Sequence, residues 1–462
     1  MISEHSLFRG AAILTSAGII SRILGFFFRI FLSHAFGEES VGLYQLTFPF
    51  YALCLSLSTS GLQTAVSRIS AEKTALGHKE EAERVLKTAL CLAAAISIFE
   101  VLIIQRHASF IAGSLLGDKR CRDLLLILSY ALPWAAVHSC INGCSLGLGN
   151  AKLPAVSQLV EQSVRIVTVI MIWLIMQTRG IPTSILPAAA GAAAGELIAA
   201  AFSVHRFKRL SCRQKKTFSR TYKASSRARI FSPLRELLAF SLPLTANRTA
   251  LTLLQSIEAA SIPASLIRYG MTSSDAIRTY GVLTGMALPC ILFPSAVTGS
   301  ISTVLLPAVS AASTAGKQHS ALSVLRKAVI SCFLLGLSCC LFFLIFGRSI
   351  GRFLFHSEDA GRFIITLAWI CPFLYTNHSL LSALNGYGMA GSTFFINMTG
   401  LLIRIAGVFL AIPGFGMQGY LWALLAGQLA VSALSSAILL RKQNKSAKGM
   451  RPRSKDLHKV QV

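Results

Sequence analysis

The chain has 462 residues, of which 53% are hydrophobic and only 13% are charged, with a formal net charge of +26. So few charged side chains cannot cover a soluble surface of this size, so lipid must cover much of it. This composition excludes an ordinary soluble enzyme and predicts a membrane protein built from helices, since spanning backbone must be hydrogen-bonded internally.

Twelve apolar runs follow one another along the chain: 10–36, 41–70, 85–105, 122–148, 153–177, 182–205, 234–261, 280–310, 323–347, 363–387, 392–412 and 417–440. Each is about long enough to cross a hydrocarbon core of ~30 Å at ~1.5 Å per residue. The sequence therefore predicts an all-α polytopic membrane protein with about twelve transmembrane helices.

The second half of the chain repeats the first at a nearly constant spacing. Pro49 matches Pro289 at an offset of 240 residues; at 239, Pro133 matches Pro372, 149–151 match 388–390, and 164–166 match 403–405. A duplicated six-helix unit is typical of secondary transporters, whose halves move about a central binding site. We therefore expect two repeated six-helix lobes around a central cavity, an N-terminal lobe at 1–206 and a C-terminal lobe at 234–440.

Basic residues gather in two segments outside the apolar runs. The linker 207–233 and its flanks, from Arg206 to Arg235, hold eleven Lys or Arg and no acid, and the tail 441–462 holds eight with one acid. The positive-inside rule places both segments, and both termini, on the cytoplasmic side of the cell membrane. Such tracts also attract anionic membrane lipids. These roles account for the basic charge, and no nucleic-acid partner is predicted.

Four arginines lie near the middle of predicted spans: Arg22, Arg165, Arg248 and Arg404, in the first, fifth, seventh and eleventh. Inserting an arginine at that depth costs about 2.5–3.5 kcal/mol of free energy on insertion scales, so such an arginine usually has a functional role. Glu161 lies one turn before Arg165, so that pair could neutralise itself. The other three have no acid one turn away and need a partner on another helix, a water-filled cavity or a ligand. Because guanidinium groups bind phosphate bidentately, we expect an anionic substrate.

Two acids in the apolar runs, Glu196 in the sixth and Glu258 in the seventh, are candidate counter-charges or parts of a Na⁺ or H⁺ coupling site. The alternative for Glu258 is a salt bridge between helices. His34, His138 and His378 are interpreted as hydrogen-bonded helix residues. No phosphate-binding loop, zinc-protease pattern or nucleophile elbow is present, so we predict neither an enzyme nor a metal or cofactor site.

Several motifs point to one family. The stretches 21–32, 42–45 and 60–68, together with 254–259 in the seventh span, closely resemble the stage V sporulation protein B and polysaccharide-biosynthesis group. That group belongs to the multidrug/oligosaccharidyl-lipid/polysaccharide exporter superfamily, which also contains the lipid II flippases. The resemblance implies a V-shaped pair of six-helix lobes around a cavity that opens to either side in turn.

The resemblance also implies a substrate and some of the residues that bind it. In lipid II flippases a cationic cavity binds the pyrophosphate of an undecaprenyl-linked sugar precursor. By motif match its first-span arginine corresponds to Arg22 and its seventh-span acid to Glu258. Arg29 corresponds less cleanly to the second arginine, because seven residues separate the two here and often six there. Those flippases carry two further C-terminal helices that hold the lipid tail, and this chain has no span after 417–440.

Three functions remain open from the sequence. The first is a flippase for an anionic lipid-linked oligosaccharide, such as a peptidoglycan or polysaccharide precursor. The second is a multidrug/cation antiporter of the same superfamily, although such a protein would commonly have an acid in its first span, where this chain has Arg22 and Arg29. The third is a non-transporting scaffold for cell-wall or spore-cortex enzymes.

Overall fold

The computed structural model describes residues 4–217, 231–314 and 318–449, and these residues form helices and the turns between them. The first repeat contains α1 (Glu4–Leu55), η1 (Ser56–Ser60), α2 (Gly61–Ala75), α3 (Lys79–Phe110), η2 (Ile111–Leu115), α4 (Cys121–Ser129), α5 (Ala131–Gly147), α6 (Lys152–Thr178) and α7 (Leu186–Thr217). The elements η1 to η3 are π-helical turns.

The second repeat contains α8 (Phe231–Tyr269), α9 (Ser273–Gly281), η3 (Val282–Ala287), α10 (Leu288–Leu292), α11 (Ser295–Thr314), α12 (Gln318–Phe355), α13 (Glu358–Ala368), α14 (Cys371–Gly386), α15 (Ala390–Leu410), α16 (Ile412–Phe415) and α17 (Met417–Gly449). The described part of the chain contains no strand. The prediction of an all-α membrane protein is confirmed.

The number of membrane crossings agrees with the predicted twelve. In the described ranges nine helices are long and apolar enough to cross, and eleven if each of two bent helix pairs counts as one span. The first of these, Ala12–Ala75, has 64 residues. A straight helix of that length would measure ~96 Å, about three times the hydrocarbon thickness. The helix is broken at Gly37 (φ 79°, ψ 168°), so we count this segment as two crossings. Counting it twice raises the number of crossings from eleven to twelve.

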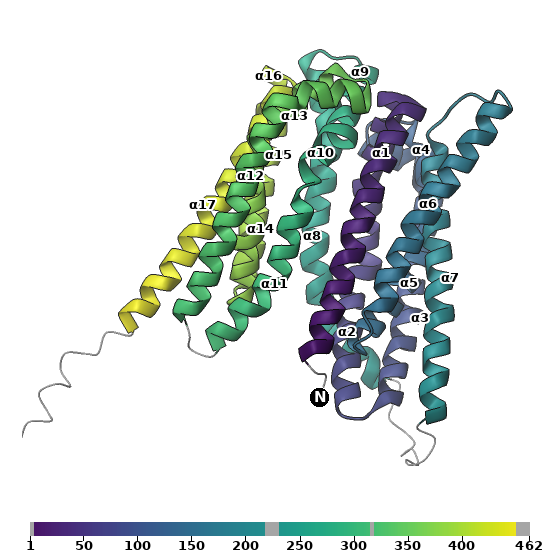
Figure 1. Cartoon of the computed structure of the whole chain (residues 1–462). Coiled ribbons are helices and arrows are strands. Elements are labelled where there is room, and N and C mark those ends of the chain that lie inside the picture. The colour runs from purple at the N-terminus through teal and green to yellow at the C-terminus, as the bar shows by residue number, and fades with distance from the viewer. Residues whose placement is uncertain (1–3, 218–230, 315–317, 450–462) are drawn as a thin grey trace, which may run out of the picture.

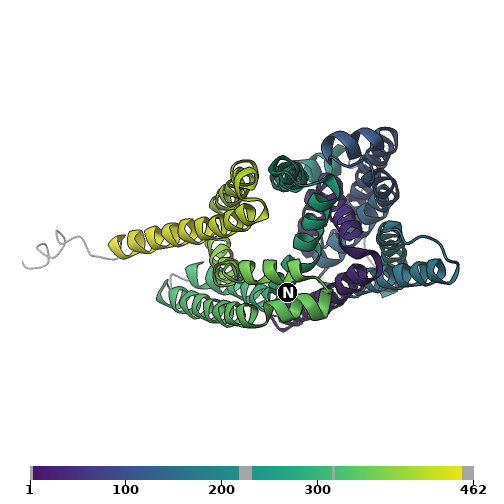
Figure 2. The same cartoon turned by 90° about the horizontal axis from the view of Figure 1, so that it is seen from above.

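The helices form two lobes that stand side by side (Figure 1). We call the end where α1 begins and α7 and α17 terminate the inner end, and the opposite end, which carries α9, α13 and α16, the outer end. The lobes meet at the outer end, and α11, α12 and α17 lean away from α2, α3 and α7 toward the inner end. From above, α17 extends away from the N-terminal lobe (Figure 2).

The internal repeat is visible at the level of single hydrogen bonds. Gly149 and Gly388 both have φ 76° and both end a helix in a Schellman motif. The amide of Asn150 donates to the Ser145 carbonyl at 2.8 Å, and that of Met389 donates to the Leu384 carbonyl at 2.9 Å. The helix pairs before these turns are bent by 41° (α4 with α5) and 55° (α13 with α14).

Helix α8 belongs to the second repeat by sequence but contacts both lobes. Near its start, Phe240 lies under the Arg68 guanidinium of α2, 4.3 Å from the ring centroid. Gly61 of α2 has no room for a Cβ atom, which would come 2.4 Å from the Ser241 carbonyl. Farther along, Ser256 donates a 2.7 Å hydrogen bond to the Pro49 carbonyl of α1. Because its last turns pack on α15 and α16, α8 connects the lobes.

Two predicted segments are described only at their edges. Helix α7 continues to Thr217 and α8 begins at Phe231, so 218–230 of the predicted linker 207–233 lie outside the described residues. Helix α17 continues to Gly449, and 450–462 of the predicted tail likewise lie outside them.

Candidate functional site

A cavity of about 360 Å³ lies within the C-terminal lobe, bordered by α8, α14, α15 and α17. Its polar lining consists of amides, one imidazole and one guanidinium: Gln255, Asn377, His378, Asn397, Gln428 and Arg404. No carboxylate belongs to the described lining. Asn377 is fixed, because its amide nitrogen donates to Gln428 Oε1 at 2.9 Å and its oxygen accepts from Ser432 at 2.6 Å. The cavity is therefore polar and, apart from Arg404, uncharged.

Arg404 forms a closed ion pair beside this cavity. Its Nε and Nη2 donate to the two oxygens of Glu258 at 2.8 and 2.9 Å, the bidentate geometry that suits a guanidinium. Tyr420 donates a third bond to Glu258 at 2.7 Å. Glu258 is 3% exposed, so all three groups are held in a low-dielectric setting. The charge of Arg404 thus meets a partner on another helix, one of the alternatives that the sequence left open.

Arg22 and Arg248 are placed differently from Arg404. Both are exposed, and in the described chain neither has a carboxylate within ion-pair distance. Arg22 extends from α1 toward the C-terminal lobe, where a Cβ on Gly299 would lie 3.6 Å from its Nη1 and where its charge is within electrostatic range of His378. Arg248 precedes Gln255 by two turns on α8, so the two share a helix face. Neither arginine belongs to the lining of the cavity itself, but each is placed close to one residue of that lining, His378 or Gln255.

The remaining two predicted arginines lie within the N-terminal lobe. Arg165 pairs with Glu161 through Nη2 and Oε1 at 2.5 Å, as the spacing of one turn predicts. Arg29 is partly buried, and the Tyr44 hydroxyl is within its electrostatic range. Tyr44 also lies within range of Arg165. Neither arginine belongs to the lining of the cavity in the other lobe.

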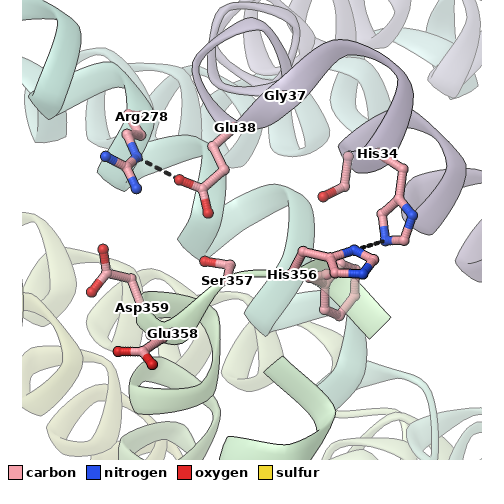
Figure 3. A pocket seen from close by; sticks show the side chains of 10 residues that line it. His34, Gly37, Glu38, Arg278, His356, Ser357, Glu358 and Asp359 are labelled. Atoms are coloured by element: carbon pink, nitrogen blue, oxygen red, sulfur yellow. Dashed lines mark hydrogen bonds and ion pairs between the residues drawn. The ribbon is translucent and has the colours of Figure 1, made fainter. Parts of the chain in front are cut away.

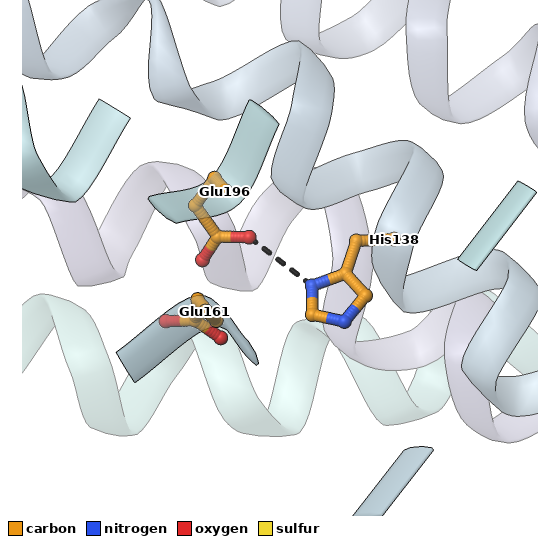
Figure 4. Close-up of side chains that lie close together, drawn as sticks. All are labelled: His138, Glu161 and Glu196. Carbon is orange, nitrogen blue, oxygen red and sulfur yellow. Dashed lines mark hydrogen bonds and ion pairs between the residues drawn. The ribbon is translucent and has the colours of Figure 1, made fainter. Parts of the chain in front are cut away.

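Glu196 joins a buried polar cluster in the N-terminal lobe (Figure 4). Its Oε2 lies 3.2 Å from Nδ1 of His138, and the other ring nitrogen lies 3.0 Å from the Ser157 hydroxyl. One candidate ligand atom from each of His138, Glu161 and Glu196 lies within 4.8 Å of the others. Nothing in the sequence indicates that His138 and Glu196 meet, because they are 58 residues apart on different helices.

A second contact between the lobes closes the outer end (Figure 3). Glu38 of α1 accepts a hydrogen bond from Arg278 of α9, and this bond raises the pKa of the Arg278 guanidinium. His34 and His356 contact each other beside it, with 3.2 Å between His34 Nε2 and His356 Nδ1 and their rings tilted by 59°. These four side chains line a cavity of about 810 Å³. Glu38 and Arg278 are 240 residues apart, the offset of the repeat, and that coincidence was the available sequence signal.

A family model described as "Polysaccharide biosynthesis protein" matches residues 7–313, about two thirds of the chain. The chain belongs to this family. Family membership and the fold agree with the resemblance carried by the sequence motifs. One relative is Stage V sporulation protein B of Bacillus subtilis (strain 168), 28% identical over 94% of this chain and 84% of that protein. Lipid II flippase MurJ of the same organism is 30% identical over 36% of this chain and 32% of that protein.

Solved transporter structures share the fold of this family member. A multidrug resistance MATE family transporter of the MOP superfamily in an inward-facing conformation matches with a TM-score of 0.72 at 15% identity, over 95% of this chain and 99% of that one. Lipid II flippase MurJ in an inward closed conformation matches with a TM-score of 0.70 at 16% identity, over 93% and 87%. At these identities the likeness establishes the two-lobed architecture. The substrate-binding roles of the five arginines stay predictions.

Proposed function

We propose that the protein is a flippase that moves an anionic lipid-linked saccharide across the membrane by alternating access, and that Arg22 and Arg248 bind its phosphate groups. The observation that carries this proposal is a pair of exposed arginines without carboxylate partners, Arg22 within electrostatic range of the cavity residue His378 and Arg248 two helical turns from the cavity residue Gln255. Two guanidinium groups without carboxylate partners favour a dianionic headgroup, because each supplies a planar fork of donors.

The contrast with Arg404 sharpens the assignment. Arg404 lines the same cavity, but Glu258 occupies Nε and Nη2 and balances its charge. Arg22 and Arg248 thus remain as two positive charges that have no carboxylate partner in the described chain. A multidrug/cation antiporter would need acids where the substrate sits, and the described lining has none. We therefore favour transport of a lipid-linked saccharide over export of a cation.

The distribution of basic residues supports one orientation of the protein in the membrane. The basic linker and tail continue from α7 and α17 at the inner end, so the inner end faces the cytoplasm of a cell whose plasma membrane holds the protein. The lobes meet at the outer end, where Glu38 binds Arg278. In this state the substrate enters from the cytoplasmic side, and anionic lipids gather around the basic segments.

The names of two relatives support a lipid-linked saccharide as the class of substrate. One is a lipid II flippase and another a stage V sporulation protein. We propose an undecaprenyl-pyrophosphate-linked saccharide, a precursor of peptidoglycan or of another polysaccharide, as the cargo. The protein performs no covalent chemistry on it. Association with cell-wall synthesis enzymes would accompany this role, and a purely scaffolding protein would leave the unpaired arginines without a purpose.

The test is binding of purified full-length protein to an undecaprenyl-pyrophosphate-linked disaccharide peptide, followed by native mass spectrometry. We expect Arg22→Gln and Arg248→Gln each to weaken binding about tenfold or more, which corresponds to about 1.4 kcal/mol per lost phosphate contact. Arg352→Gln is the matched control, because Arg352 is exposed at the outer end and pairs with Glu358. The uncharged polyprenol should bind wild type and variants alike. Equal binding of the pyrophosphate lipid to all four proteins would refute the assignment.

A further inference from the structure

We propose that His34 and His356 bind a zinc ion between the two lobes at the outer end (Figure 3). His34 lies on α1 in the N-terminal lobe, and His356 directly follows α12 in the C-terminal lobe. The two residues are 322 positions apart, so the sequence shows no metal-binding spacing. Binding of the metal stands on this geometry alone, whereas its effect on transport rests on the proposed flippase function.

The first argument is the distance between the two ligand atoms. His34 Nε2 and His356 Nδ1 are 3.2 Å apart. A tetrahedral zinc ion with bonds of about 2.0–2.1 Å to nitrogen holds two such ligands roughly 3.3–3.4 Å apart. Small rotations of the two side chains therefore suffice for both imidazoles to bind one ion. Imidazole suits Zn²⁺, Cu²⁺ and Ni²⁺, whereas Mg²⁺ and Ca²⁺ prefer oxygen, so the ligands also indicate the class of metal.

The second argument concerns the hydrogen atoms of this pair. Two neutral imidazoles cannot both present an N–H to each other at 3.2 Å. His34 Nε2 lies only 2.7 Å from the Leu354 carbonyl, so a hydrogen on this nitrogen bonds mainly to that carbonyl. The lone pair of His356 Nδ1 is then left facing the other lobe. A metal ion replaces this hydrogen and engages both lone pairs, while each ring stays neutral with its hydrogen on the other nitrogen.

The backbone at His356 is the third argument. With φ 51°, His356 is the only residue other than glycine that has a positive φ in the described chain. A left-handed residue after the end of a helix is usually glycine, because a side chain strains this conformation. Here the strained residue carries an imidazole that faces His34 across the contact between the lobes (Figure 3). Strain of this kind is typical of ligand-binding positions.

The cavity of about 810 Å³ at the outer end can complete the coordination. Its lining contains three carboxylates, Glu38, Glu358 and Asp359, and one guanidinium, Arg278. Glu38 is bound to Arg278, whereas Glu358 and Asp359 form exposed arginine pairs with N–O distances of 2.8 and 3.7 Å. Exposed pairs contribute little stability, so either of these two carboxylates can exchange its arginine for the metal. The structure thus holds two ligands in place and leaves the others to a carboxylate and to water.

A metal ion held by both lobes favours the state in which their outer ends are closed. His34 and His356 separate when the outer end opens, so the ion keeps both ligands only in the closed state. A ligand that binds one state better shifts the population toward that state by its differential affinity. Both imidazoles are exposed, so the metal can exchange with the medium at the outer end. Zinc should therefore slow transport when it is added on that side.

The test is calorimetric titration of ZnCl₂ into the purified full chain in phosphatidylcholine nanodiscs, without cargo and after isolation through a tag that lacks histidine. We expect saturable binding of Zn²⁺ and none of Mg²⁺. His34→Gln and His356→Gly should each weaken Zn²⁺ binding about 100-fold or more, because losing a residue that merely supports a metal ligand already costs about 10–100-fold. His356→Gly also relieves the left-handed backbone, so its melting temperature without metal should equal or exceed that of the wild type.

Three further variants locate the site. His78→Gln removes an exposed histidine that contacts Glu81 between α2 and α3, and it should bind Zn²⁺ like the wild type. Weaker binding in one of Glu358→Gln and Asp359→Asn would support a carboxylate as the third ligand. Zinc binding of equal strength in the wild type, His34→Gln and His356→Gly would overturn the proposal. An absence of Zn²⁺ binding to the wild type would also overturn it.

The effect on transport is measured separately, in proteoliposomes that hold a fluorescent pyrophosphate-linked lipid. Zn²⁺ added on the side of the outer end should slow flipping by the wild type more than flipping by His356→Gly, and comparing the two proteins cancels direct binding of Zn²⁺ to the lipid. Equal slowing of both proteins would refute the effect on transport and leave the site intact. Zinc binding together with no pyrophosphate-lipid binding would refute the flippase proposal alone, so the two failures are distinguishable.

Discussion

Arg165 and Arg404 occupy equivalent positions in the two repeats, yet their surroundings have diverged. Arg404 has one carboxylate, Glu258, which it binds with two hydrogen bonds, and Tyr420 completes the group. Arg165 has two carboxylates nearby, one on its own helix and one on α7, and the second is bonded to His138. The C-terminal group therefore pairs one carboxylate with one guanidinium, whereas the N-terminal group brings two carboxyl groups together with one guanidinium and one imidazole.

The comparison shows that an arginine at equivalent positions of two repeats can have different partners in each lobe. A balanced group such as that of Arg404 ties α15 to α8 and stabilises the lobe. A group with two carboxyl groups beside one guanidinium should instead respond to pH. The following experiments test this difference in order of expected effect.

The largest effect is expected from Glu258→Gln. This change leaves the partly buried Arg404 guanidinium without its counter-charge, which should cost about 3 kcal/mol of stability. The melting temperature in nanodiscs measures the loss. The double variant Glu258→Gln, Arg404→Met removes the stranded charge as well and should recover part of the stability. A double variant no more stable than the single one would show that the ion pair is not what stabilises this contact.

The corresponding change in the other lobe is Arg165→Gln. It leaves Glu161 and Glu196 with two negative charges and should cost about 2 kcal/mol at pH 8. Because proton uptake neutralises these carboxylates, the deficit relative to wild type should shrink as the pH falls from 8 to 6. Parallel thermal melts across this pH range give the measurement. A deficit that is constant with pH would contradict the presence of ionised carboxylates next to Arg165.

Two tyrosines offer a matched pair of single-atom changes. Tyr420→Phe removes a hydrogen bond to a charged group and should cost about 1.5 kcal/mol. Tyr51→Phe removes a buried hydroxyl without a partner, so at pH 8 it should leave the stability unchanged or raise it by up to about 1 kcal/mol. Both are read from the same thermal melts. Equal costs would mean that the Tyr51 hydroxyl has a partner in solution.

The smallest effects are expected where the repeats are most alike. Gly149 and Gly388 share the same left-handed backbone, which a side chain strains. Gly149→Ala and Gly388→Ala should therefore each cost about 1 kcal/mol, with values that agree within a few tenths, as measured by thermal melts. Clearly unequal costs would show that the two turns differ in their surroundings despite their shared geometry.

The sequence could predict the features that recur in both repeats and the contacts within one helix. The offset of 239 to 240 residues, the twelve spans and the pairing of Glu161 with Arg165 follow from periodicity and from the geometry of one helix. The family motifs led to the correct family and fold. These features need no knowledge of how the helices pack.

The sequence could not predict partners on different helices. Arg404 and Glu258 are 146 residues apart, and nothing in the periodicity of either helix indicates which faces meet. For the same reason Arg22 and Arg404 looked equivalent as unpaired midplane arginines, while the structure leaves one exposed and pairs the other. His138 is a hydrogen-bonded helix residue, as the sequence predicts, but an isolated histidine in an apolar run does not indicate which carboxyl group it meets.

The bond between Glu38 and Arg278 has a consequence for the balance between access states. The outer end must separate when the cavity turns outward, and this ion pair then breaks. Arg278 is 54% exposed, and exposed ion pairs contribute only about 0–1 kcal/mol and weaken with salt. The closed outer end is thus a weak latch, and the ionic strength of the external medium becomes one of the factors that set how often the transporter opens outward.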